Sequence, residues 1–368
     1  MGGWFGKAEQ TQPNQHFLPG KTFLPRTRHS SLDTTASLLS NLARMIRQFV
    51  PAFIAALLTA TLLPAQDQAV TPPQPKQEKA IFEFQDGDRL VLLGNTVFER
   101  EQRYACFEPR LTLALGETKI TVRNLAWSAD TVFGHARSYF GPPEEGLQRL
   151  TAHLDLLKPT VVMLCYGSEL AFEKLGGLPD FLTGYRNLLE LIRKHAPGAR
   201  LVIVSPPPLE TLPPPMPDLT DANKSLSSLR DALRKFATSQ NTWFIDLFEL
   251  MGGIPKPGVI SKPLTDNGVH YTREGYEKLS SCLVEGLGLS APIMAPAELE
   301  TIRREVLAKD ELFFNRWRPQ NETYLFGFRK HEQGQNAKEI PMFDPLIDQA
   351  DARIQAAKMQ LLQSKKRL

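Results

Sequence analysis

The feature that most constrains the fold is a series of short apolar segments separated by amphipathic ones. Three of these segments, residues 90–93, 160–165 and 200–205, are apolar along most of their length. A strand that is apolar on both sides is buried on both faces, which is typical of parallel strands covered by helices. The pattern therefore predicts a three-layer α/β/α fold built on a parallel sheet.

The rest of the central region continues this alternation. Two further strands are expected at residues 119–125 and 242–247. Helices are expected between the strands and after the last one, at residues 97–115, 146–157, 182–195, 219–238 and 272–286. Crossovers between parallel strands are right-handed in almost all proteins, and we expect the same here. The sequence thus predicts one domain with a five-stranded parallel sheet over residues 81–290.

Composition narrows the class of protein. Apolar residues make up 42% and charged residues 23% of the 368-residue chain, which is typical of a globular protein. The net charge is +3, and the predicted domain contains no long basic run, so nucleic acid is not expected as a partner. The three cysteines, Cys106, Cys165 and Cys282, have no CxxC spacing. No metal and no cofactor are expected.

The N-terminal part is expected to lie outside the domain. Residues 1–44 are polar, rich in Gln and Ser and aperiodic, which indicates a start-site artefact upstream of Met45 or a disordered segment. Residues 45–65 combine a basic start, an apolar run and Ala65, the features of a secretory signal peptide. An uncleaved anchor or a buried helix are the alternatives. Residues 66–80 are rich in Gln, Pro and Lys and predict a linker. We therefore expect a secreted, periplasmic or cell-envelope protein with no membrane span after cleavage.

Polar side chains gather where the predicted strands end. Because parallel strands share one carboxyl edge, four stretches should meet there: residues 94–96, 124–131, 166–169 and 264–276. Each could have an ordinary structural role when taken alone. Thr96, Ser128 or Asp130 could cap a helix, Gly167 could serve only to turn the chain, and a lone His270 is more often structural than catalytic. Their common position makes a functional site the stronger interpretation.

These stretches, in this order on a five-strand pattern, resemble the motifs of the SGNH (GDSL) hydrolases, a family of flavodoxin-like esterases and lipases. The most specific matches are Asn124, Ser128, Asp130 and Thr131 in the second stretch, and the run Asn267, Gly268, Val269, His270 with Gly275 and Tyr276 in the fourth. The resemblance covers residues 81–290. It implies an acyl-enzyme mechanism, in which a hydroxyl attacks an ester while a histidine takes its proton.

The resemblance assigns roles to residues that differ from the family pattern. At the nucleophile position Thr96 replaces serine, and Asn95 replaces the preceding aspartate. Threonine keeps the hydroxyl, although its extra methyl group restricts rotation and crowds the attacked carbonyl. The oxyanion positions fall on Ala129, Gly167 and Glu169. Ala129 in place of glycine loses little if its φ is negative, whereas an ionised Glu169 in place of asparagine would repel an oxyanion.

The base and its orienting residue are the last part of the site. His270 matches the family histidine, and Asn267 stands where the family has the triad aspartate. An asparagine there favours the wrong imidazole tautomer. Asp266 is adjacent and could take the aspartate's role if the loop is offset by one residue. The sequence leaves both residues open as partners of His270.

Two functional classes follow. The first is a divergent secreted esterase or carbohydrate deacetylase in which Thr96 attacks and His270 acts as base. The second is a catalytically degenerate module that binds an ester or carbohydrate ligand in the same cleft. A third possibility, Ser128 or Ser168 as nucleophile, has no support from the family pattern.

A C-terminal extension over residues 291–368 is expected to be mostly helical. Residues 297–314 carry an apolar stripe that includes Leu299, Ile302 and Val306, and residues 345–363 predict a second helix. Between them, residues 315–333 are dense in aromatic residues, arginine and asparagine. Such a segment suits packing onto the domain or binding of carbohydrate. It resembles the extensions of planctomycete-type secreted SGNH proteins.

Overall fold

The structure is a computed structural model. It describes residues 80–139, 141–254, 262–290, 292–332 and 336–366. The expected start-site segment, signal peptide and linker therefore lie outside the described residues, apart from Ala80. Within the described ranges, no helix is both long enough and apolar enough to span a membrane.

The centre of the fold is one parallel sheet. Its five strands lie in the order β2-β1-β3-β4-β5, and all neighbouring pairs are parallel. The strands are β1 (Asp88–Gly94), β2 (Ile120–Asn124), β3 (Val161–Cys165), β4 (Arg200–Val204) and β5 (Trp243–Ile245). In register, Leu92 pairs with Asn124 and Gly94 with Cys165, so the carboxyl ends of β1, β2 and β3 lie side by side. The prediction of a five-stranded parallel sheet is confirmed.

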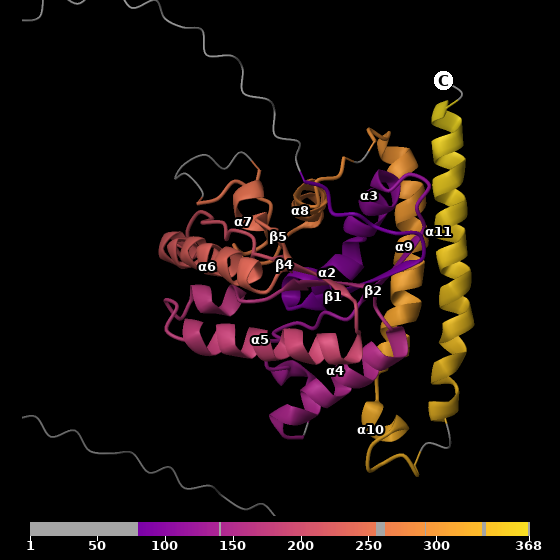
Figure 1. Ribbon diagram of the computed structural model, residues 1–368, viewed down its shortest axis with the longest axis horizontal. Coiled ribbons are helices and arrows are strands. Elements are labelled where there is room, and N and C mark those ends of the chain that lie inside the picture. The colour runs from indigo at the N-terminus through magenta and orange to yellow at the C-terminus, as the bar shows by residue number, and fades with distance from the viewer. Residues whose placement is uncertain (1–79, 140, 255–261, 291, 333–335, 367–368) are drawn as a thin grey trace, which may run out of the picture. The chain divides into compact units, whose positions relative to one another are not determined.

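Helices cover both faces of this sheet (Figure 1). Along β1, Val91 and Leu93 belong to one hydrophobic core, whereas Leu90 and Leu92 belong to the other. The same alternation divides β3, where all five side chains are buried. Because both faces of each strand are covered, every position must be apolar, and this explains the continuous apolar runs in the sequence. The fold is therefore the expected three-layer α/β/α arrangement.

The helices follow the predicted order with shifted boundaries. One face of the sheet is covered by α4 (Pro143–Leu157), α5 (Leu178–His195) and α6 (Thr220–Ser239), and the other by α2 (Thr96–Tyr104), α3 (Phe107–Ala114) and α8 (Arg273–Gly286). The short elements are η1 (His135–Arg137), η2 (Ser168–Ala171) and α7 (Leu247–Leu250).

The single helix expected over residues 97–115 was wrong, because the chain breaks between α2 and α3. Ala105 has a φ of 48°, in the left-handed region, and closes α2. The buried carboxylate of Glu101 then accepts hydrogen bonds from the backbone N–H groups of Cys106 (2.6 Å) and Phe107 (2.5 Å). These bonds satisfy donors at the start of α3 that have no partner within the helix. An acidic residue in a helical pattern gives no sequence signal for this tertiary cap.

The C-terminal extension is helical and packs onto the domain. It contains α9 (Pro296–Trp317), α10 (Glu322–Leu325), η3 (Asn336–Lys338), η4 (Ile340–Met342) and α11 (Phe343–Lys366). Figure 1 shows α9 and α11 side by side beyond the β2 edge of the sheet. The buried Lys309 of α9 donates to Glu108 of α3 at 2.6 Å, and Arg123 of β2 pairs with Asp351 of α11 at 2.5 Å. The extension is thus part of the same packed unit as the sheet.

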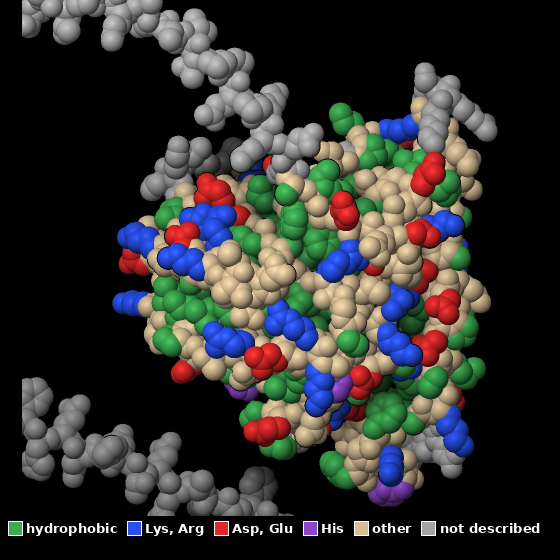
Figure 2. Space-filling model, viewed as in Figure 1, with side chains coloured by type: hydrophobic (Ala, Val, Ile, Leu, Met, Phe, Trp, Pro, Cys, Tyr) green, Lys and Arg blue, Asp and Glu red, His purple; other side chains and the backbone are tan. Residues whose placement is uncertain are grey.

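The surface carries both signs of charge. On the face drawn in Figure 2, Lys and Arg side chains are interspersed with Asp and Glu. This mixture agrees with a net charge of only +3.

Candidate active site

The first part of the site is the turn that follows β1. A side chain at Gly94 would place its Cβ 2.5 Å from the carbonyl oxygen of Cys165 on the adjacent strand, so only glycine fits there. Asn95 then caps α2, with its side chain accepting from the Val97 N–H at 3.3 Å. Thr96 is consequently the first helical residue and not the helix cap. Its side chain lies at the carboxyl edge of the sheet, where ligands bind in open α/β folds.

The Thr96 hydroxyl faces the loop that follows β2. Its Oγ1 accepts a hydrogen bond from the backbone N–H of Ala129 at 3.3 Å. The φ of Ala129 is 60°, so the condition of a negative φ is not met and this alanine occupies the left-handed region. A non-glycine residue there costs of order 1 kcal/mol or more. The backbone N–H of Ala129 nevertheless lies beside the Thr96 hydroxyl, as a donor to an oxyanion formed at that hydroxyl must.

His270 lies on the loop before α8 and is oriented by Asn267. The Oδ1 atom of Asn267 accepts from the backbone N–H groups of Val269 (3.1 Å) and His270 (2.9 Å), which fixes the orientation of the amide. Its Nδ2 then lies 3.3 Å from Nδ1 of His270. An amide nitrogen can only donate, so Nδ1 accepts and the neutral ring carries its proton on Nε2. This is the tautomer in which Nε2 cannot act as base.

Asp266 faces a different partner. Its carboxylate lies 3.4 Å from Nη2 of Arg100, and Asn267 is the residue in contact with the His270 ring. Burial, with a further contribution from the charge of Arg100, lowers the pKa of His270 below its ordinary 6.5. The imidazole is therefore neutral at neutral pH. Among the described residues, no hydrogen bond joins Thr96 to His270.

The loop after β3 supplies Gly167 and Glu169. Gly167 has a φ of 106°, and a Cβ there would lie 2.9 Å from Leu229 and 3.0 Å from Phe181, so the turn requires glycine. Glu169 follows in η2, at the family position of an asparagine. Burial raises the pKa of Glu169 above its ordinary 4.5, which favours the neutral acid. A neutral carboxyl can donate a hydrogen bond, whereas the ionised form cannot.

Ser128 and Asp130 have structural partners. Ser128 donates to Glu99 at 2.9 Å. Asp130 is buried, pairs with the buried Arg137 at 2.7 Å and accepts from the Tyr166 hydroxyl at 3.3 Å. These contacts hold the loop that presents Ala129.

One cavity of about 210 Å³ joins these groups. Its lining includes Asn95, Thr96, Ala129, Asp130, Thr131, Ser168, Glu169 and His270. The structure therefore brings together the predicted nucleophile, one oxyanion donor, the substituted oxyanion position and the histidine. Gly167, Asp266 and Asn267 are not among the residues that line it.

Residues 94–278, half of the chain, match the model of the GDSL-like lipase/acylhydrolase family. The chain belongs to this family. The match spans all four stretches that form the cavity, and the GDSL-like fold accounts for their position at one sheet edge. No curated protein matches the chain.

Solved structures with a similar fold were also found. A protein described as a GDSL-like lipase from Parabacteroides merdae is 16% identical, with a TM-score of 0.47, over 57% of this chain and 100% of that one. A gut microbial diltiazem-metabolising enzyme is 13% identical, with a TM-score of 0.48, over 78% and 95% of the two chains. A catalytic mutant of an acetylxylan esterase from Geobacillus stearothermophilus is 14% identical, with a TM-score of 0.41, over 58% and 99%.

Several residues of this GDSL-like site were not predicted. Arg100 lines the cavity one helical turn after Thr96, and Phe172 forms part of its wall. Glu99 holds Ser128 and lies 3.8 Å from the guanidinium of Arg318, which is stacked 3.7 Å above the Trp127 ring. The spacing of Thr96 and Arg100 places them on one helix face and could have indicated Arg100. The contact with Arg318, more than 200 residues away along the chain, has no local signal.

Proposed function

We propose that this family member is a slow carboxylic ester hydrolase. Thr96 Oγ1 attacks the ester carbonyl carbon, and the His270 ring accepts the hydroxyl proton. The Ala129 N–H stabilises the oxyanion, the leaving alcohol takes the proton from His270, and water then hydrolyses the acyl-threonine. The observation that carries the proposal is the Thr96 hydroxyl, which lies 3.3 Å from the Ala129 N–H in the cavity that His270 also lines.

The substitutions explain why turnover should be slow. Asn267 selects the tautomer in which Nδ1 accepts, so the form with a basic Nε2 is a minor one. The equivalent loss of an aspartate in serine proteases costs about 10⁴-fold in rate. Loss of one oxyanion donor costs about 10²–10³-fold, and ionised Glu169 would impose at least such a loss.

A second candidate function is binding without catalysis. The same Asn267 geometry makes Nε2 of His270 a hydrogen-bond donor, which suits the recognition of an ester or sugar oxygen.

The substrate class, whether simple ester or acetylated carbohydrate, is part of the proposed hydrolase function. We also propose that the protein is exported, which the signal-like residues 45–65 support. The C-terminal extension supports a place among the planctomycete-type members of the family. A mature N-terminus near Gln66 after export would support cleavage.

Hydrolysis of p-nitrophenyl acetate tests the proposed reaction. We expect Thr96→Ala and His270→Ala each to reduce kcat/KM to the background of the uncatalysed reaction. Thr183→Ala and His195→Ala are matched controls on α5, outside the cavity, and should retain the wild-type rate. Activity that survives both Thr96→Ala and His270→Ala would exclude the mechanism. If the wild type is inactive and the triple change Thr96→Ser, Glu169→Asn, Asn267→Asp creates activity, the binding function is favoured.

A further inference from the structure

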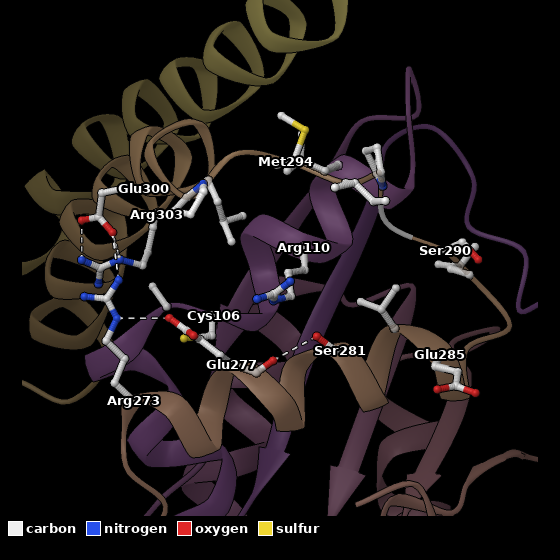
Figure 3. Close-up of a pocket in the computed structure, with 18 of the residues that line it drawn as sticks. Cys106, Arg110, Arg273, Glu277, Ser281, Glu285, Ser290, Met294, Glu300 and Arg303 are labelled. Atoms are coloured by element: carbon white, nitrogen blue, oxygen red, sulfur yellow. Dashed lines mark hydrogen bonds and ion pairs between the residues drawn. The ribbon is translucent and has the colours of Figure 1, made fainter. Parts of the chain in front are cut away.

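A second, larger hollow lies on the outer side of the helices. Its volume is about 720 Å³, and it is enclosed by α3, α8, the start of α9 and the described residues of the connection between α8 and α9 (Figure 3). It shares no lining residue with the Thr96 cavity. Ligand pockets for small molecules typically measure about 300–1,000 Å³, so this hollow has the size of a binding site.

Arg110 is the group that distinguishes this hollow. Figure 3 shows its side chain extending into the middle of the space. Among the described residues, its guanidinium has no carboxylate partner, and only its Nε atom is shielded from the space. The two Nη groups are therefore available to form charge-assisted hydrogen bonds with an anionic ligand.

The neighbouring arginines differ from Arg110 because they are neutralised. Arg303 lies 2.5 Å and Arg273 3.0 Å from the carboxylate of Glu300. Hydrogen bonds and charge from Arg303 and Arg273 lower the pKa of Glu300 to about 2, so this carboxylate stays ionised. The network occupies one side of the hollow in Figure 3, away from Arg110.

The remaining walls combine apolar and polar side chains. The apolar ones are Leu113 of α3, Val284 of α8, Leu289 and Met294 of the connection, and Leu299 of α9. Cys106 also lines the hollow, and burial, together with the charge of Glu101, raises the pKa of its thiol to about 12. The thiol is therefore neutral and does not repel an anion. Apolar side chains beside the unpaired guanidinium of Arg110 match a molecule with an aliphatic body and one anionic group.

We propose that this hollow binds the anion of an aliphatic carboxylic acid, with the carboxylate on Arg110 and the chain along the apolar wall. A guanidinium binds a carboxylate with two parallel hydrogen bonds, so one arginine is sufficient. Glu277, which pairs with Arg273 at 3.4 Å, and Glu285 line the same space and repel a dianion such as a phosphate monoester more strongly than a monoanion. The site does not depend on ester hydrolysis, because no residue of the Thr96 cavity contributes to it.

Calorimetric titration of the full chain with dodecanoate tests this site. We expect saturable binding of one molecule, and at least tenfold weaker binding for Arg110→Gln. Arg110→Lys should retain part of the affinity. Ser281→Trp, on the exposed surface of α8 at the edge of the hollow, should block binding without disturbing the core. The matched control Arg186→Gln, on an exposed position of α5, should bind as the wild type does.

Two further ligands and two variants define the site. 1-Dodecanol should bind at least tenfold more weakly than dodecanoate, and dodecyl phosphate should bind no more tightly. Thr96→Ala and His270→Ala should leave dodecanoate binding unchanged, whereas loss in these variants would place the ligand in the Thr96 cavity and overturn the proposal. Absence of saturable binding, or wild-type affinity in Arg110→Gln with an unchanged circular dichroism spectrum, would also overturn it.

Discussion

The two cavities of this protein differ in the partners of the side chains to which we assign a function. In the Thr96 cavity, the reactive groups have partners within the protein: Thr96 accepts from Ala129, and His270 accepts from Asn267. In the larger hollow, the guanidinium of Arg110 has no carboxylate partner among the described residues. In the functions proposed above, the first cavity holds a substrate between fixed groups, whereas the second offers an unpaired cation to its ligand.

Within the Thr96 cavity, the backbone turns that place the loops and the side chains that set the chemistry are separate properties. Gly94 and Gly167 fit turns that would not accept a side chain, and these turns place the loops as a GDSL-like site requires. Asn267 and Glu169 change the protonation of the site without disturbing that frame. A change at either residue should therefore alter the rate and leave the fold intact.

The largest effect is expected for Asn267→Asp. A carboxylate at this position accepts from Nδ1–H of His270, so Nε2 becomes the basic nitrogen. We expect kcat/KM for p-nitrophenyl acetate to rise by about 10²–10⁴-fold. Asp266→Asn is the matched control and should not raise the rate, because Asp266 faces Arg100. An unchanged rate in Asn267→Asp would contradict the role assigned to the tautomer. Dodecanoate binding should be unaffected, which separates the two cavities.

A smaller rise in kcat/KM, about 10²-fold at a pH above the pKa of Glu169, is expected for Glu169→Gln. The wild-type rate should rise as pH increases through the pKa of His270, which lies below 6.5, because the neutral imidazole is the base. It should fall as pH increases through the pKa of Glu169, which is raised above 4.5, because the ionised carboxylate repels the oxyanion. A pH–rate profile of both proteins measures this.

Glutamine donates a hydrogen bond at every pH, so Glu169→Gln should remove the descending limb and keep the ascending one. Persistence of the descending limb in Glu169→Gln would show that another group controls it. A rate that falls at high pH would distinguish this site from one with an asparagine oxyanion donor, which does not ionise.

The sequence was sufficient for the frame of the molecule. Continuous apolar strands such as residues 161–165 define a sheet covered on both faces, and polar stretches at strand ends define the edge at which Thr96 and His270 meet. Boundaries depended on tertiary contacts, as at Ala105, where the distant cap by Glu101 ends one helix and begins the next.

The details of the site were harder to predict because they depend on atoms, not on residue types. The left-handed backbone of Ala129 and the orientation of the Asn267 amide are set by loop geometry that no pattern specifies. The Arg110 hollow is formed by α3 and by α8 and α9, which lie more than 150 residues further along the chain and share no motif with α3. Single-sequence reasoning has no signal for such a site.

Covalent labelling tests the central claim, that Thr96 is the nucleophile, most directly. The Asn267→Asp protein would be incubated with p-nitrophenyl ethylphosphonate, which transfers its phosphonyl group to an activated hydroxyl, and the product digested and mapped by mass spectrometry. We predict one phosphonyl group per chain, on the peptide that contains Thr96, and none after Thr96→Ala. A label on Ser128 or Ser168, or equal labelling of the Thr96→Ala protein, would contradict the account.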